Sequence, residues 1–268
     1  MRPPGLHGDT TTGIDFVEEY VTVADRLATA VASRDLRAPV PSCPGWTAYD
    51  LVCHLGNVHA WAATIVETGR FAVEQNDEPG SHKPRVVSDW YAAKAEDLLA
   101  VLRLVDPARP TWNFAFGEGG DAAFWRRRQL HETLVHGVDL GLPVVSPVLA
   151  ADGVDEVLTV FLHRMHHRGR PAALTAPLSL YAADLERGWT LTPRPVPPSR
   201  APGTPHTPSY DGPPLVVERL HPAADRITAP ADVLYRLLWK RVAADDPMIT
   251  RTGDRTRLDA FLASPLTP

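Results

Sequence analysis

Apolar side chains recur every three or four residues in several segments of the N-terminal half, a spacing typical of amphipathic helices. In the first segment Phe16, Tyr20 and Leu27 share one face. Thr11 or Thr12 is expected to cap the helix that carries them. The pattern predicts four helices, over residues 12–34, 47–68, 88–104 and 121–140, with Thr47 and Asp121 as N-caps of the second and fourth. Four helices separated by glycine- and proline-containing loops favour a helical bundle.

The C-terminal half has short apolar runs instead of long helical periodicity. Its segment from Leu178 to Leu191 is typical of two strands around a turn. Further strands are expected over residues 215–220, 226–228 and 249–253, and helices over 151–167, 230–242 and 255–262. Nine prolines between Pro193 and Pro214 predict a long loop.

These elements predict an α+β fold in two domains. A chain of 268 residues is long enough for one large domain or two modest ones. We expect a helical bundle over residues 10–145, a connector helix over 146–175, and a smaller α+β domain over 176–265 that contains the proline-rich loop 193–214.

Composition narrows the classes of function. A net charge of −5 argues against a nucleic-acid partner, because such surfaces need a basic field, and Arg126–Arg128 is only a local exception. The sequence has no stretch of 18 uninterrupted apolar residues, so no membrane span is predicted. Residues 1–13 lack the apolar run of a secretory signal. Cys43 and Cys53 are poorly spaced for a disulfide. A cytoplasmic protein without a membrane partner is therefore expected.

Three side chains on the second and fourth predicted helices have the chemistry of metal ligands. Glu132 and His136 are four residues apart, so they lie one turn apart on the same helix face. His54, on the facing helix, completes a set of two histidines and one carboxylate, which leaves a divalent ion with an open position. His131 and His136 are five apart and point to different faces, so the zinc-protease pattern HExxH does not apply.

A second interpretation of the same residues stays open. Arg128, Glu132, His136 and Asp139 also fit a solvated helix face with ion pairs between residues four apart. A single histidine such as His54 is more often a hydrogen-bonded structural residue than a ligand. The residue pattern alone does not choose between the two.

Two segments resemble the mycothiol-dependent maleylpyruvate isomerase family, part of the DinB-like four-helix metalloprotein superfamily. They are CPGWTAYDLVCHLGNVHAWAA (residues 43–63) and RRRQLHETLVHGVDLG (126–141). The segments TAPADVLYRLLWKRV (228–242) and GDRTRLDAFL (253–262) are similar to the family's smaller second domain. The resemblance implies a DinB-like bundle whose metal ligands are His54, Glu132 and His136. One departure is Gly137, where the family usually has a basic residue.

The resemblance also implies a chemistry. A divalent metal, zinc by preference although nickel or iron also suit the donors, would activate the thiol of mycothiol for addition to a small electrophilic substrate. Trp125 and Arg128 are expected to contact the thiol cofactor, and Arg128 and Arg241 to bind substrate carboxylates. The reaction is then a cis–trans isomerisation or an S-transfer. A metal-dependent hydrolase or a non-catalytic DinB-like binding protein is the alternative, and a monomer or small homo-oligomer is expected.

Other residues near these motifs receive weaker predictions. Asp50, one turn before His54, is expected to orient its imidazole as an outer carboxylate. His59 falls on another face and is expected to serve packing or the surface. Cys43 is interpreted as a buried thiol in a turn, and Cys53 points away from His54 and is not expected to be a ligand.

Overall fold

The computed structural model describes residues 13–115, 117, 119–144, 146–193, 215–219 and 223–268. The chain divides into two compact units, residues 1–145 and 146–268. The first is a four-helix bundle and the second a smaller α+β unit, so the predicted fold class is confirmed. Thr11, Thr12 and all but the first residue of the proline-rich loop lie outside the described residues.

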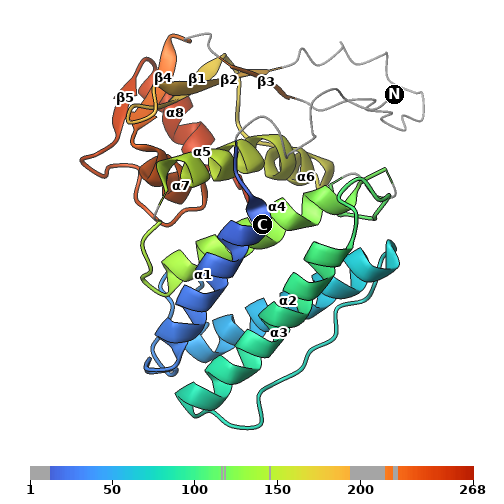
Figure 1. Ribbon diagram of the computed structural model, residues 1–268. Coiled ribbons are helices and arrows are strands. Elements are labelled where there is room, and N and C mark those ends of the chain that lie inside the picture. The colour runs from blue at the N-terminus through green and yellow to red at the C-terminus, as the bar shows by residue number, and fades with distance from the viewer. Residues whose placement is uncertain (1–12, 116, 118, 145, 194–214, 220–222) are drawn as a thin grey trace, which may run out of the picture. The chain divides into compact units, whose positions relative to one another are not determined.

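The bundle contains the helices α1 (Phe16–Val31), α2 (Ala48–Thr68), α3 (Pro84–Leu104) and α4 (Ala122–Asp139). α1 packs against both α3 and α4, and α2 packs against the same two helices. Around the bundle, α1 and α2 are therefore each flanked by α3 and α4 (Figure 1). This arrangement brings the inner face of α2 opposite α4, the helix that carries the other two predicted ligands.

The helix ends follow local side-chain chemistry. Thr47 and Asp50 form a capping box at the start of α2, and the Asp121 carboxylate accepts from the Phe124 N–H at the start of α4, so both predicted caps are confirmed. The first helix begins at Phe16 behind Asp15 instead of at residue 12. α3 begins four residues earlier than predicted because a proline is well suited to the first turn of a helix.

A close approach of α2 and α3 sets the position of the turn after His54. A Cβ atom built on Gly56 would lie only 2.3 Å from Cζ3 of Trp90. Only a residue without a side chain allows the indole of Trp90 to pack directly against the α2 backbone here. Gly56 is buried, and the neighbouring Leu55 is completely buried in the bundle core.

The second unit combines a five-stranded sheet with helices. Its strands are β1 (Leu178–Ala182), β2 (Arg187–Pro193), β3 (Leu215–Arg219), β4 (Asp225–Ala229) and β5 (Thr250–Thr252). Among the described strands the order is β3-β2-β1-β4-β5, in which β1 and β4 are parallel and the other neighbouring pairs antiparallel (Figure 1). The helices are α5 (Pro147–Glu156), the π-helical segment η1 (Val157–Phe161), α6 (Leu162–His167), α7 (Ala231–Leu238) and α8 (Arg255–Ala263). The helix expected as a connector therefore starts at Pro147 and belongs to this unit.

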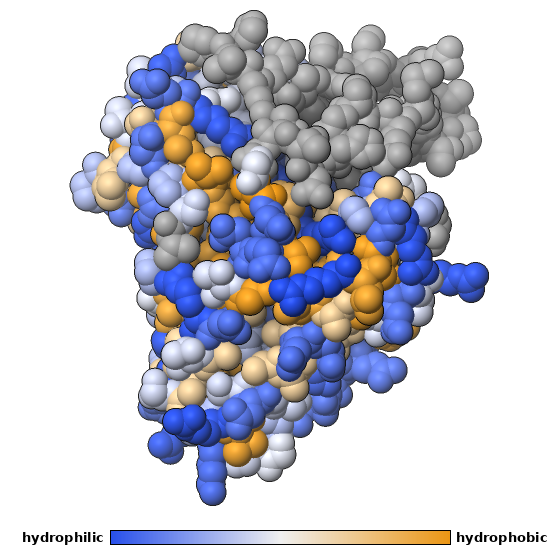
Figure 2. Space-filling model, in the orientation of Figure 1, coloured by the Kyte–Doolittle hydropathy of each residue, from blue (hydrophilic) through white to orange (hydrophobic). Residues whose placement is uncertain are grey.

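In the described part of the chain, no helix combines the length and hydropathy needed to cross a bilayer. On the face shown in Figure 2, hydrophilic side chains are interspersed with hydrophobic ones. Among the described residues, the large apolar side chains most exposed to solvent are Phe71 and Val73 in the loop after α2, Leu104 at the end of α3, and Met248 before β5.

Candidate metal centre

His54 from α2 meets Glu132 and His136 from α4. One ligand atom from each residue lies within 4.8 Å of the other two. Nε2 of His54 is 3.6 Å from Oε1 of Glu132, and Nε2 of His136 is 3.3 Å from the same oxygen. The two imidazole rings stand edge to face, with centroids 5.3 Å apart.

These separations fit a shared cation. Zinc bonds of about 2.05 Å in a tetrahedron place neighbouring ligand atoms roughly 3.3 Å apart. A separation of 3.6 Å between His54 and Glu132 is longer than an ordinary hydrogen bond. Two imidazole nitrogens and one carboxylate oxygen are also a common donor set for catalytic zinc. The residues present therefore fit a divalent metal with an open coordination position.

Arg128 holds the carboxylate of Glu132. Its guanidinium NH2 donates to Oε2 at 2.5 Å, which leaves Oε1 directed at the two histidines. The Arg128 side chain is only 2% exposed. Burial by itself raises the pKa of Glu132, but Arg128, His136 and His54 outweigh it and hold that pKa well below its usual range. Glu132 is thus an anion before any metal binds.

Asp139 holds the other ring nitrogen of His136. Its Oδ2 lies 2.9 Å from Nδ1, and the carboxylate is completely shielded from solvent. Burial lowers the pKa of His136, but hydrogen bonds to Asp139 and Glu132 dominate and raise it. Asp50 was expected to orient the imidazole of His54, and this prediction was wrong. The Asp50 carboxylate instead accepts hydrogen bonds from the backbone N–H and the hydroxyl of Thr47. The outer carboxylate belongs to Asp139, whose only sequence signal is its position three residues after His136.

The centre opens on the side of His54. The side chain of His54 is 32% exposed, against 17% for Glu132 and 10% for His136. The half-buried indole of Trp46 packs beside it, with ring centroids 5.0 Å apart.

Comparison with known proteins gives a family match for the bundle that carries these residues. The family model described as the mycothiol maleylpyruvate isomerase N-terminal domain matches residues 17–141, the range that holds all four bundle helices except the first residue of α1. The helical bundle of this chain is therefore similar to the N-terminal domain of mycothiol maleylpyruvate isomerases. The curated proteins gave no match.

Two solved structures are similar to this chain in fold. One is described as the crystal structure of the mycothiol-dependent maleylpyruvate isomerase, with a TM-score of 0.57 at 12% identity, covering 88% of this chain and 91% of the other. The second is a histidine-to-alanine mutant of that enzyme, with a TM-score of 0.56 and the same identity and coverage. At this identity the likeness concerns the fold.

The remaining predicted site residues lie in different surroundings. Trp125 is completely buried, and its indole N–H donates to the Trp112 carbonyl, so the side chain offers no surface to a cofactor in this structure. Arg241 belongs to the second unit, where its guanidinium donates to the Trp239 carbonyl and lies over the Trp239 ring. Gly137 is buried, and a Cβ there would make an ordinary 3.6 Å contact with Leu142.

Below the candidate centre, His59 forms a buried polar contact between helices. Nδ1 lies 2.8 Å from Oε1 of Gln129 on α4, and Nε2 lies 3.4 Å from the hydroxyl of Tyr91 on α3. The ring is completely buried and packs edge to face with Tyr20 of α1. His59 therefore links all four helices, and burial lowers its pKa to about 4 despite the hydrogen bond to Gln129.

This burial predicts a loss of stability in mild acid. Because the folded-state pKa of His59 is about 4 and its ordinary value is 6.5, the unfolded chain takes up a proton first. The contribution of neutral His59 is complete above pH 6.5 and is lost as the pH falls towards 4, by up to about 3 kcal/mol. Urea unfolding of the wild type and a His59→Gln variant across this range measures it. If the free energy of unfolding changed with pH in the same way in the two proteins, the prediction would be contradicted.

Proposed function

We propose that this protein is a metal-dependent enzyme that uses a low-molecular-weight thiol, mycothiol, to attack a small electrophilic substrate. The observation that carries the proposal is the spacing of His54, Glu132 and His136, whose donor atoms surround one point with an open side. His54, Glu132 and His136 would hold a divalent metal, zinc by preference, which would lower the pKa of a thiol that binds to it and so supply a thiolate at neutral pH.

The residues of this chain prepare the centre for that role. Arg128 keeps Glu132 ionised and turned towards the histidines, and Asp139 orients His136. Because Arg128 is buried on Glu132, we assign it a positioning role in preference to the predicted direct contact with substrate or thiol. Arg241 stays our proposal for the cation that binds a substrate carboxylate.

The reaction follows from thiol addition to a carbon–carbon double bond conjugated with a carbonyl. The sulfur lone pair forms a C–S bond, and the π electrons move towards the carbonyl oxygen. The former double bond then rotates freely. Loss of the thiolate restores the double bond as the trans isomer and returns the thiol, which is isomerisation. If the C–S bond persists and a proton is taken up at carbon, or another leaving group departs, the outcome is S-transfer.

The requirement for a thiol is the decisive test. The zinc-loaded protein is expected to isomerise maleylpyruvate only when mycothiol is added. Maleylpyruvate is chosen because it appears in the name of the structural relatives. Product is followed by absorbance and NMR, and free thiol is titrated before and after. Unchanged thiol indicates isomerisation, whereas stoichiometric loss with this or another electrophile indicates S-transfer.

A mycothiol analogue without the sulfur is the matched control and should support no turnover. Equal activity with and without the thiol would overturn the proposal and favour a hydrolase. Binding of ligands without turnover of any of several electrophiles would favour a non-catalytic protein.

A further inference from the structure

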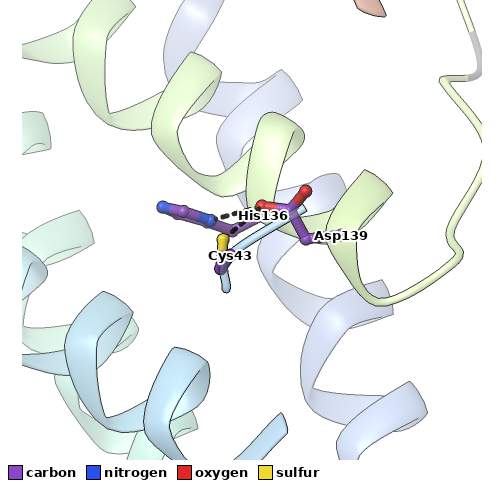
Figure 3. Close-up of side chains that lie close together, drawn as sticks. All are labelled: Cys43, His136 and Asp139. Carbon is purple, nitrogen blue, oxygen red and sulfur yellow. Dashed lines mark hydrogen bonds and ion pairs between the residues drawn. The ribbon is translucent and has the colours of Figure 1, made fainter. Parts of the chain in front are cut away.

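The turn before α2 contacts the end of α4 through Asp139. The hydroxyl of Ser42 donates to Oδ1 of Asp139 at 2.5 Å, and the thiol of Cys43 donates to Oδ2 at 3.6 Å. Figure 3 shows the Asp139 carboxylate reaching both His136 and the sulfur of Cys43. In the sequence, almost the whole bundle lies between these two turn residues and Asp139.

The same carboxylate determines which nitrogen of His136 is free. Oδ2 lies 2.9 Å from Nδ1, so an anionic Asp139 places the ring proton on Nδ1. Nε2, which lies 3.3 Å from Oε1 of Glu132, is then the nitrogen that would give up its proton and offer a lone pair to the proposed metal. An imidazole ligand held by an outer carboxylate has a fixed tautomer and orientation, which strengthens its bond to a metal.

The turn is itself held by backbone hydrogen bonds. Cys43 N–H donates to the Val40 carbonyl, Trp46 N–H to the Cys43 carbonyl, and Val40 N–H to the Trp46 carbonyl. Gly45 has φ +86°, a conformation that other residues rarely adopt. Trp46, from the same turn, packs on His54. One hydrogen-bonded turn therefore reaches both histidines of the candidate centre. It contacts His54 directly with Trp46, and it is linked to His136 by way of Asp139.

From these contacts we infer that Ser42 and Cys43 are positioning residues of the metal centre, acting through Asp139 on His136. The inference rests on the proposed function, since it concerns the same site. The two donors orient the buried carboxylate, and the carboxylate orients the ring. Cys43 acts here as a hydrogen-bond donor and not as a nucleophile or a ligand.

A second arrangement of the same atoms makes a different prediction. One donor atom each from Cys43, His136 and Asp139 also lies within 4.8 Å of the others, so this trio would be a second metal site if Nδ1 lost its proton. The Ser42 hydrogen bond and the 2.9 Å contact to Nδ1 favour the protonated ring and the positioning role.

Zinc affinity, measured on the full chain by competition with a chromophoric chelator, tests the inference. Asp139→Asn is expected to weaken zinc binding about 10- to 100-fold. Ser42→Ala/Cys43→Ala should weaken it in the same direction by at least about threefold, and it serves as the second test if the Asp139 variant does not fold. Cys43→Ser should stay within about twofold of the wild type, since a hydroxyl also donates to a carboxylate.

A buried hydroxyl elsewhere in the bundle supplies the control. Ser88 donates to the Ala28 carbonyl at 2.8 Å, so Ser88→Ala lowers stability without changing zinc affinity. If Asp139→Asn and the double variant lower only the melting temperature of the metal-free protein and bind zinc like the wild type, the inference is overturned while the proposed function stands.

Two further outcomes have separate meanings. Two cobalt ions per chain, with a thiolate charge-transfer band that disappears in Cys43→Ser, would replace the positioning role with a second metal site. A wild type that binds no zinc overturns the proposed function and this inference together.

Discussion

Replacing both His54 and Glu132 with alanine is expected to remove the proposed divalent metal. The wild type should carry about one zinc per chain and the double variant less than about a tenth of that, because one imidazole cannot retain the ion without its two partners. Elemental analysis after dialysis against a weak chelator measures the metal, and thiol-dependent turnover should disappear with it. The reason is geometric: Oε1 of Glu132 is the atom shared by both histidine contacts.

Controls for this experiment come from the surface of the same chain. His167→Ala/Glu67→Ala removes one histidine and one glutamate that are both exposed and lie outside the candidate centre. It should keep the full metal content. Equal metal in the wild type and in the His54/Glu132 variant would refute the assignment of the centre, and the proposed chemistry would fall with it.

Replacing Arg128 with methionine is expected to destabilise the metal-free protein by about 3–5 kcal/mol. The change leaves the Glu132 carboxylate largely buried and ionised without the guanidinium that accompanies it at 2.5 Å. Urea unfolding followed by tryptophan fluorescence measures the loss. Excess zinc should restore part of it, because a cation at the histidines again neutralises Glu132 and binds only the folded state.

A double-mutant cycle isolates the charge effect. Arg128→Met/Glu132→Gln should be more stable than Arg128→Met alone, since no unpaired charge remains buried. Arg103→Met is the matched control: Arg103 pairs with Glu18 at 2.8 Å, but both side chains are more than half exposed, so its loss should cost no more than about 1 kcal/mol. Similar costs for Arg128→Met and Arg103→Met would show that the buried pair has no special role.

The helices and their caps could be predicted because they depend on neighbours along the chain. Thr47 and Asp121 cap as expected, since a cap needs only the next three residues. The start of the first helix was placed too early, because apolar periodicity locates a helix face better than its end, which Asp15 sets. The strand order, in which β4 pairs with β1, depends on contacts that no local pattern contains.

For the candidate centre, the sequence by itself determined which three residues to propose as metal ligands. Glu132 and His136 share a helix face by spacing alone, His54 completes the set from the facing predicted helix, and the family resemblance implies the same three residues. Only the tertiary structure decided how this set is held: Arg128 is buried on Glu132, and Asp139 takes the outer role expected of Asp50. The physical reason is that spacing along a helix tells which side chains share a face. Which turn packs against that face, and so which donors reach it, depends on how the whole bundle closes.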